Sequence, residues 1–182
     1  MTRRRFQLSD AMNTGIFMRM STRFEEGKVR GCIEAVGPKF VMVSLISEGM
    51  WFDGFECFRI TDIIRAEPDP YATFAEAALK KRRQKRPKKP RVDLANIKTL
   101  LLSAARDFPL VTINREEIDP DVCWIGRVLD VNGGRVSLLE IGPDAKWDHK
   151  PNEYSLKEIT RVGFGADYED ALYSVGGDPS RA

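Results

Sequence analysis

The sequence has little of what enzyme active sites and metal centres usually require. Its 182 residues include a single histidine, His149, so one chain cannot assemble a His-based metal cluster or a His-dependent catalytic triad. Gly-rich phosphate loops and Cys/His zinc spacings are missing as well. Asp53 and Asp148 each stand alone in an expected loop, and a lone carboxylate defines no general acid or base. We therefore expect a protein that is not an enzyme and that holds no metal or cofactor.

Cysteine and long apolar runs are scarce too. Cys32, Cys57 and Cys123 are an odd number of thiols, and no two of them form a Cys-x-x-Cys pair. This argues against a disulfide framework and favours reduced thiols in a cytoplasm. No apolar run approaches the roughly 18 residues that span a bilayer, and the basic N-terminus, residues 1–6, lacks the apolar stretch of a secretory signal. We expect a cytoplasmic protein with no membrane partner.

Basic charge is concentrated at one place. The net charge is +2, but nine of the 29 lysines and arginines lie in residues 80–91, which contain no acid. Residues 1–79 hold 10 basic and 11 acidic side chains, and residues 92–182 hold 10 basic and 16 acidic ones. These totals predict no positive surface on the folded parts. The nine cations are Lys80, Lys81, Arg82, Arg83, Lys85, Arg86, Lys88, Lys89 and Arg91.

An internal repeat fills most of the chain. Residues 31–46 align with residues 126–141 without a gap, and further pairs match when one residue of slippage, and later a second, is allowed. So many matches of residue type and order indicate a duplication. The matched pairs are Gly31 with Gly126, Ile33 with Val128, Val36 with Val131, Val41 with Val136, Val43 with Leu138, Ile46 with Ile141, Trp51 with Trp147, Phe58 with Tyr154, Arg65 with Arg161 and Tyr71 with Tyr168.

Each copy reads as five short strands. Asn132-Gly133-Gly134 between apolar runs is a strong hairpin signal, because these residues tolerate positive φ. Gly37-Pro38 takes the same place in the first copy, where Glu26-Gly27 predicts another tight turn. Five short strands with a tight hairpin describe a small barrel, whose closure removes exposed edges. The expected strands cover residues 16–23, 33–36, 40–46, 55–60 and 63–65 in the first copy. In the second copy they cover 110–114, the run that ends at the Asn132 turn, 135–141, 154–156 and 161–164.

Segments whose apolar residues recur at helical spacing flank each barrel. We expect one helix from residue 71 to about residue 85, stopped by Pro87, one that Asp93 caps and Pro109 ends, and a short one over residues 168–175. The apolar residues on one side of the first helix are Phe74, Ala77 and Ala78.

The predicted fold class is therefore mainly β with flanking helices (α+β), as two tandem five-stranded small barrels. The expected domains are residues 1–79 for the first barrel with its helix, 80–92 for a basic helix end and linker, 93–175 for the second unit, and 176–182 for a flexible tail.

The sequence resembles the Sm and Sm-like small-barrel family. The resemblance lies in a helix followed by five strands, with a glycine early in the second strand and Ile-x-x-Ile before the fifth, and residues 24–45 and 124–138 carry it. SH3-like barrels produce much of the same pattern. The second copy, residues 123–175, also resembles a recurrent type of uncharacterised bacterial protein. The family resemblance implies a small-barrel fold and RNA as a partner.

The chain departs from that family at the residues that hold RNA. Sm proteins that bind uridine-rich RNA resemble one another in an Asp-x-Met-Asn-type turn and in an Arg-Gly step before the last strand. At the turn this chain has residues 37–40 and 132–135, without that motif, and at the step only Arg65 and Arg161 match. The base pocket therefore does not carry over, and the fold alone implies little about RNA. The two arginines either contact a ligand or form surface ion pairs.

The run from Lys80 to Arg91 is the strongest functional feature. Closely spaced cations neutralise phosphates, with an affinity that falls steeply as salt rises. The other interpretation is a solvated helix end and a stiff, Pro-containing linker. Nothing adjacent to the run offers the stacking aromatics expected of sequence-selective single-strand binding. Trp51 and Trp147 either stack on a base or fill a partner's pocket, or else cover the open end of each barrel.

The leading hypothesis is a non-enzymatic binding protein that contacts nucleic acid, specifically RNA, through the basic linker and the barrels. The alternative is a protein-interaction module that uses the barrels and the loop tryptophans, with the acidic second unit facing a basic partner. Small barrels pair through edge strands, and the two copies can satisfy that tendency within one chain. We therefore expect a monomer or a small oligomer.

Overall fold

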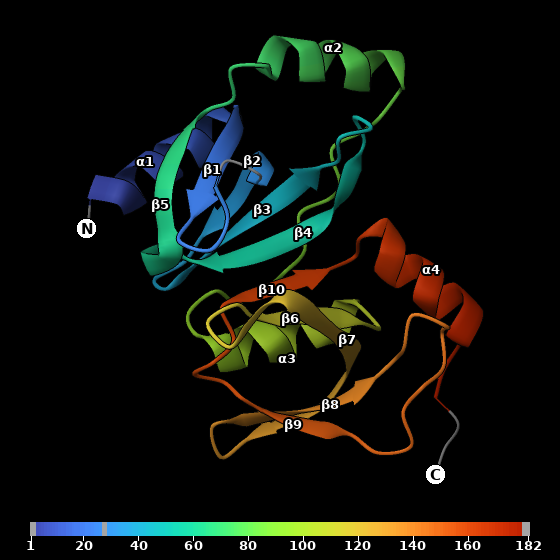
Figure 1. Cartoon of the computed structure of the whole chain (residues 1–182). Coiled ribbons are helices and arrows are strands. Elements are labelled where there is room, and N and C mark those ends of the chain that lie inside the picture. Colours follow the sequence, from blue (N-terminus) through green and yellow to red (C-terminus); the bar gives the residue numbers. More distant parts are fainter. Residues whose placement is uncertain (1–2, 27–28, 180–182) are drawn as a thin grey trace. The chain divides into compact units, whose positions relative to one another are not determined.

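The computed structural model describes residues 3–26 and 29–179 (Figure 1). The chain divides into two compact units, residues 1–89 (unit 1) and residues 90–182 (unit 2), and each is described by itself. The described residues contain four α-helices, ten strands and one 3₁₀ turn. None of these helices is both long and apolar enough to cross a bilayer.

Unit 1 is built on an antiparallel sheet of five strands in the order β5-β1-β2-β3-β4. Strand β3 of this sheet is nearly all apolar and buried along almost its whole length, as expected for residues rich in β-branched and aromatic side chains. The elements are α1 (Arg3–Thr14), β1 (Phe17–Thr22), β2 (Val29–Val36), β3 (Phe40–Ile46), β4 (Phe52–Arg59), η1 (Ile60–Asp62), β5 (Ile63–Pro68) and α2 (Ala72–Lys81).

Helix α1 supplies part of the core of unit 1. Leu8 and Ala11, three residues apart and so on one face, are buried against Met20 and Ile33 of the sheet. The residues of α1 carry no strong helix signal of their own, because its apolar positions are few and it begins with a run of arginines. The expected turn at Glu26-Gly27 falls partly outside the described residues, since residues 27 and 28 are not described.

Unit 2 repeats this plan with its sheet in the order β10-β6-β7-β8-β9. Helix α3 packs on β6 and β7 through the buried residues Leu100, Leu101 and Ala104. Beyond its C-terminal end, the ring of Phe108 packs on Phe164 with centroids 4.8 Å apart. The elements are α3 (Ile97–Asp107), β6 (Val111–Arg115), β7 (Asp119–Asn132), β8 (Arg135–Glu140), β9 (Asn152–Ser155), β10 (Arg161–Phe164) and α4 (Asp167–Gly176).

The prediction of two closed five-stranded barrels is wrong: the fold is α+β, and its antiparallel sheet is open. In unit 1 the order begins at β5 and ends at β4, and in unit 2 it begins at β10 and ends at β9. Closure is not needed to bury the apolar faces, because side chains from helices cover them. Leu8 of α1 and Leu101 of α3 are fully buried in these positions.

The duplication is visible in the backbone at two matched glycines. A Cβ on Gly31 would lie 2.0 Å from Ser44 O, and a Cβ on Gly126 would lie 2.3 Å from Leu139 O. Neither distance is physically allowed, so in both copies the second strand must carry glycine where the third strand crosses it closely.

The predicted match of Trp51 with Trp147, which requires a one-residue shift between the two copies, is wrong. Ile46 pairs with Phe52, and its counterpart Ile141 pairs with Trp147, so Phe52 is the residue equivalent to Trp147. Trp51 O accepts the N–H of Ser47, whereas in unit 2 Lys146 O accepts the equivalent bond from Gly142. The tryptophans therefore hold different positions. Further along, Phe58 opposite Val41 and Tyr154 opposite Val136 are equivalent, as predicted.

The capping residue expected for α3 is also wrong. Asn96 caps this helix, because its side chain accepts the N–H of Thr99 at 3.0 Å and Thr99 Oγ1 accepts the N–H of Asn96 at 3.4 Å. This reciprocal pair is a capping box. Asp93 instead accepts the N–H of Ala95 at 2.8 Å in the turn before the helix.

Candidate nucleic-acid interface

Helix α2 ends in a hydrogen-bonded turn that leads into the basic segment (residues 80–91). The N–H of Gln84 donates to Leu79 O at 2.9 Å and the N–H of Arg83 donates to Lys80 O at 3.1 Å. These two bonds form a Schellman motif, and Arg83 takes the left-handed conformation, φ 54°, that glycine usually occupies there. The helix expected to reach Lys85 therefore ends at Lys81, where the motif satisfies the last carbonyls.

The basic segment is exposed and largely uncompensated. All nine of its cations are exposed to solvent. Only Arg86 forms an ion pair within the described part of the chain. Uncompensated cations on one short stretch produce a local positive potential that attracts polyanions. The sequence identified these residues correctly as a concentration of charge, and the structure places it beside α2.

Arg86 ties the basic segment to the sheet of unit 1. Its Nε donates to Glu34 Oε1 at 2.7 Å and its Nη2 donates to Ile33 O at 3.3 Å. Ser44 Oγ donates to the same carboxylate oxygen at 2.6 Å. Glu34 and Ser44 are buried on β2 and β3, so the carboxylate is fixed and Arg86 compensates its charge. The segment is therefore docked at one point on unit 1, with exposed cations on both sides of it.

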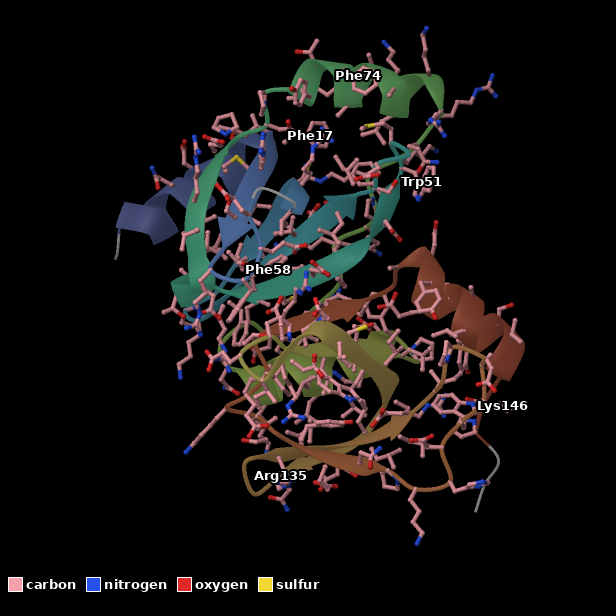
Figure 2. All side chains as sticks on the ribbon, in the orientation of Figure 1. Phe17, Trp51, Phe58, Phe74, Arg135 and Lys146 are labelled. Atoms are coloured by element: carbon pink, nitrogen blue, oxygen red, sulfur yellow. The ribbon has the colours of Figure 1, made fainter. Side chains whose placement is uncertain are left out.

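Trp51 lies beside the first turn of the basic segment. The guanidinium of Arg82 is 5.8 Å from the centroid of its ring, within the range of a cation–π interaction. Its ring also lies against Gly49, where a Cβ would come within 1.9 Å of the ring. The ring of Trp51 therefore contacts both Gly49 and Arg82, and 36% of the residue stays exposed. Figure 2 labels Trp51 and Phe74 in this part of unit 1.

Two aromatic residues of α2 were missed as site residues. The buried side of the helix is formed by Ala75 and Leu79, whereas Phe74 is 61% exposed and Tyr71, at the N-cap, is 63% exposed. The sequence placed Phe74 with Ala77 and Ala78 on one side of the helix, and that side is not the buried one. At 100° per residue, Phe74 and Ala77 lie on the same solvent face as Lys81. The signal was present in the sequence, since Tyr71 and Phe74 precede the basic segment by about 2.5 and 1.7 helical turns.

Trp147 has a structural role in unit 2. It packs against the buried cluster of Leu110, Ile141 and Leu172, and its Nε1 donates to Gly177 O at 3.1 Å. Arg127 lies 5.6 Å from the centroid of its ring and pairs with Asp178 at 2.5 Å. These contacts occupy the tryptophan on both its polar and its apolar side.

A pocket of about 440 Å³ opens beside this cluster in unit 2. Arg127 and Tyr173 line it together with residues 105–109 at the end of α3. Two of its polar side chains, Arg127 and Tyr173, already bind Asp178, Tyr173 through its hydroxyl at 2.9 Å.

The arginines that resemble the family's RNA pocket are equivalent in the two sheets but not alike. Arg65 lies opposite Ser21 and Arg161 lies opposite Asn114. Arg65 is exposed and pairs with Glu67 at 2.7 Å. Arg161 is 18% exposed and pairs with Glu116 at 3.2 Å. Both are ion-paired, Arg65 on the surface and Arg161 largely buried, so a role in ligand contact stays a prediction.

The remaining chemical groups do not converge. His149 is exposed in the loop before β9. Within residues 3–26 and 29–179, no group of three or more His, Cys, Asp or Glu side chains is placed to hold a metal ion. The geometry therefore concentrates its recognisable binding chemistry, exposed cations next to exposed aromatic rings, at α2 and the basic segment.

Comparisons with known proteins assign the chain to no family. No family model matches the chain, and neither a curated protein nor a solved structure matches it significantly. The resemblance to Sm and Sm-like proteins stays a prediction from the sequence, and the function must be argued from the site.

Proposed function

We propose that this protein is a non-enzymatic nucleic-acid-binding protein that binds RNA through the basic segment, residues 80–91. The observation that supports this most is that eight of the nine exposed cations there have no ion-pair partner among the described residues. An uncompensated cation gains more from a phosphate than one that already has a carboxylate beside it. Binding is electrostatic in origin and reads little sequence.

The anchor at Arg86 supports the proposal further. A linker that served only as a spacer would gain nothing from a fixed path, whereas a binding surface benefits from being held in place. Arg86 reaches the buried Glu34 and so holds the chain between Lys85 and Lys88 against unit 1. The cations on either side of Arg86 therefore extend from a backbone that this ion pair holds in place.

The duplication provides an internal comparison. Helix α4 of unit 2 takes the place of α2, with Tyr168 matching Tyr71, but it has no basic residue in its last turn and carries Asp167, Glu169 and Asp170 in its first turn. The repeated fold therefore does not require cations after this helix. Their presence after α2 is a property of unit 1 alone, as expected for an acquired binding site.

Charge reversal tests the proposal. We expect a variant with Lys80, Lys81, Arg82 and Arg83 each changed to Glu to lose association with total cellular RNA at about 50 mM salt. A second variant with Lys85, Lys88, Lys89 and Arg91 changed to Glu leaves α2 untouched and should lose it as well. The matched control reverses four exposed cations elsewhere, Lys39, Lys98, Arg106 and Lys150. This control has the same net charge as the other two and should still bind.

Two results would count against the proposal. If the unaltered protein does not associate with RNA at this salt concentration, the basic segment is a spacer. If all three variants lose binding equally, the effect comes from net charge and not from this segment. Recovery of one stoichiometric protein partner that resists nuclease treatment would favour the alternative, a protein-interaction module.

A further inference from the structure

We propose that the site binds single-stranded nucleic acid, because Tyr71 and Phe74 of α2 offer exposed rings on which unpaired bases stack. This inference rests on the proposed function and adds the class of nucleic acid. The cations alone attract any polyanion, so the inference depends on the two aromatic rings as well.

The two rings have no structural partner. Phe74 and Tyr71 are 61% and 63% exposed, and neither makes a ring contact with another described residue. Leaving two large aromatic side chains in water forgoes the stabilisation that their burial would give. The helix packs without them, through Ala75 and Leu79.

Unit 2 indicates that the fold does not need an aromatic residue at position 74. The buried Ala75 of α2 corresponds to the buried Leu172 of α4, so the residue that corresponds to Phe74 is Ala171. Ala171 is exposed, as Phe74 is. The same helix therefore forms in unit 2 with a methyl group at this place, and the ring in unit 1 is free to serve a partner.

The rings and the cations lie within the span of a short oligonucleotide. Phe74 and Lys81 share the solvent face of α2 and are seven residues apart, about 10 Å along the helix axis. Stacking of a base on an aromatic side chain requires an unpaired base with an accessible face, and it tolerates any sequence. Phosphates on the same strand can then reach Lys80, Lys81 and Arg83. RNA and DNA single strands share this chemistry, and the experiment separates them.

Charge alone would give the opposite preference. A duplex carries about one charge per 1.7 Å of its axis, a higher density than a single strand, so a purely electrostatic site favours the duplex. A preference for the single strand therefore requires another source of affinity, and the exposed rings supply it.

The test compares 12-nucleotide single strands of RNA and of DNA with the corresponding duplexes by fluorescence anisotropy at about 50 mM salt. We expect the protein to bind the single strands more tightly than the duplexes. Changing both Tyr71 and Phe74 to Ala should weaken single-strand binding about 10-fold or more and leave duplex binding unchanged. Thr73→Ala on the same helix is the matched control and should change neither.

The outcomes separate this inference from the proposed function. Equal binding of single strands and duplexes, unaffected by the double variant, would overturn the stacking inference and leave the electrostatic function standing. Loss of duplex binding in the double variant would also overturn it, because the rings would then act through the fold. Failure to bind either form would overturn the proposed function itself. Tighter binding of the RNA strand supports the proposed function, whereas tighter binding of the DNA strand would count against RNA as the ligand.

Discussion

At the scale of single residues, Arg83 combines a backbone cost with an exposed charge. It holds φ 54° at a helix terminus where glycine has no steric penalty, and a non-glycine residue pays about 1 kcal/mol in this region. Its side chain is exposed and forms no ion pair within the described residues. Backbone strain at a residue that contributes nothing to packing indicates a functional role.

Replacing Arg83 with Gly should therefore separate stability from binding. We expect Arg83→Gly to raise the free energy of unfolding by about 0.5–1 kcal/mol, because the left-handed strain is relieved. The same change should weaken RNA binding, because one cation is lost. Urea denaturation and anisotropy measure the two effects. Arg83→Lys keeps both the strain and the charge, and should change neither; a loss of stability in Arg83→Gly would contradict this account.

The thiols predict a change of stability at alkaline pH. Burial raises the pKa of Cys32 from 9.0 to about 11, with Arg86 opposing the shift, and burial raises the pKa of Cys57 further. Because the folded state holds these protons more tightly than the unfolded chain, their contribution is complete below about pH 9 and is lost as pH rises through 11. Urea denaturation between about pH 8 and pH 11 should show stability falling.

A Cys32→Ala variant gives the matched comparison for this pH effect. It should lose less stability than the unaltered protein over the same pH range, because one of the shifted groups is gone. Cys123 is exposed, so Cys123→Ser should follow the unaltered protein. If the curves for Cys32→Ala and the unaltered protein are parallel, Cys32 is not buried as described.

At the scale of elements, α2 packs on unit 1 through a small apolar side, and its second apolar side, which carries Phe74, faces the solvent. Leu79 is 5% exposed and packs with Phe17, Cys32 and Ile46, whereas Phe74 is 61% exposed. The larger side chain should therefore matter less for stability. We expect Leu79→Ala to lower the free energy of unfolding by about 2–3 kcal/mol. Phe74→Ala should change it by less than about 0.5 kcal/mol.

Thermal or urea unfolding of the two variants checks this assignment. Leu79→Ala must be the more destabilised of the two, although it removes fewer atoms. The reverse order would mean that the apolar side of α2 seen in the sequence is the one that packs, and the aromatic site would then have no basis.

The bounds of the helices and strands show which parts of the fold were predictable from the sequence. The strands Phe40–Ile46 and Arg161–Phe164 have the expected bounds, and for Phe40–Ile46 the reason is an almost unbroken run of β-formers between two turns. Helix α1 was missed and α2 was given too long, since an arginine-rich start and a Schellman turn at Arg83 carry no strong sequence signal. Barrel closure was inferred from strand count, and strand count does not determine whether a helix covers the sheet instead.

The candidate site was predictable in its charge and not in its geometry. The nine cations are a compositional fact, and the sequence gives them directly. Which of them is neutralised depends on Glu34, 52 residues away in the chain, and no local pattern connects that residue to Arg86. The exposure of Phe74 depends on which side of α2 packs, and with so many alanines around it the helix has no clear apolar stripe.

At the scale of the whole molecule, a duplicated scaffold has kept its sheets and diverged in its surfaces. Gly31 and Gly126 preserve the close crossing of strands in both units. The helix that follows the last strand of each sheet is basic and aromatic in unit 1, and acidic in unit 2. In the proposed function, binding therefore depends on the basic segment, which is present in one copy alone.

The salt dependence of RNA binding tests this central claim most directly. For a 12-nucleotide single strand, we expect log Kd to rise with log salt concentration with a slope of about 3–5, since each phosphate neutralised contributes about 0.7. Changing Lys80, Lys81, Lys88 and Lys89 to Gln should lower the slope by about 2 or more, whereas changing Lys39, Lys98, Arg106 and Lys150 to Gln should leave it unchanged. Equal slopes in both variants, or no RNA binding at low salt, would contradict the account.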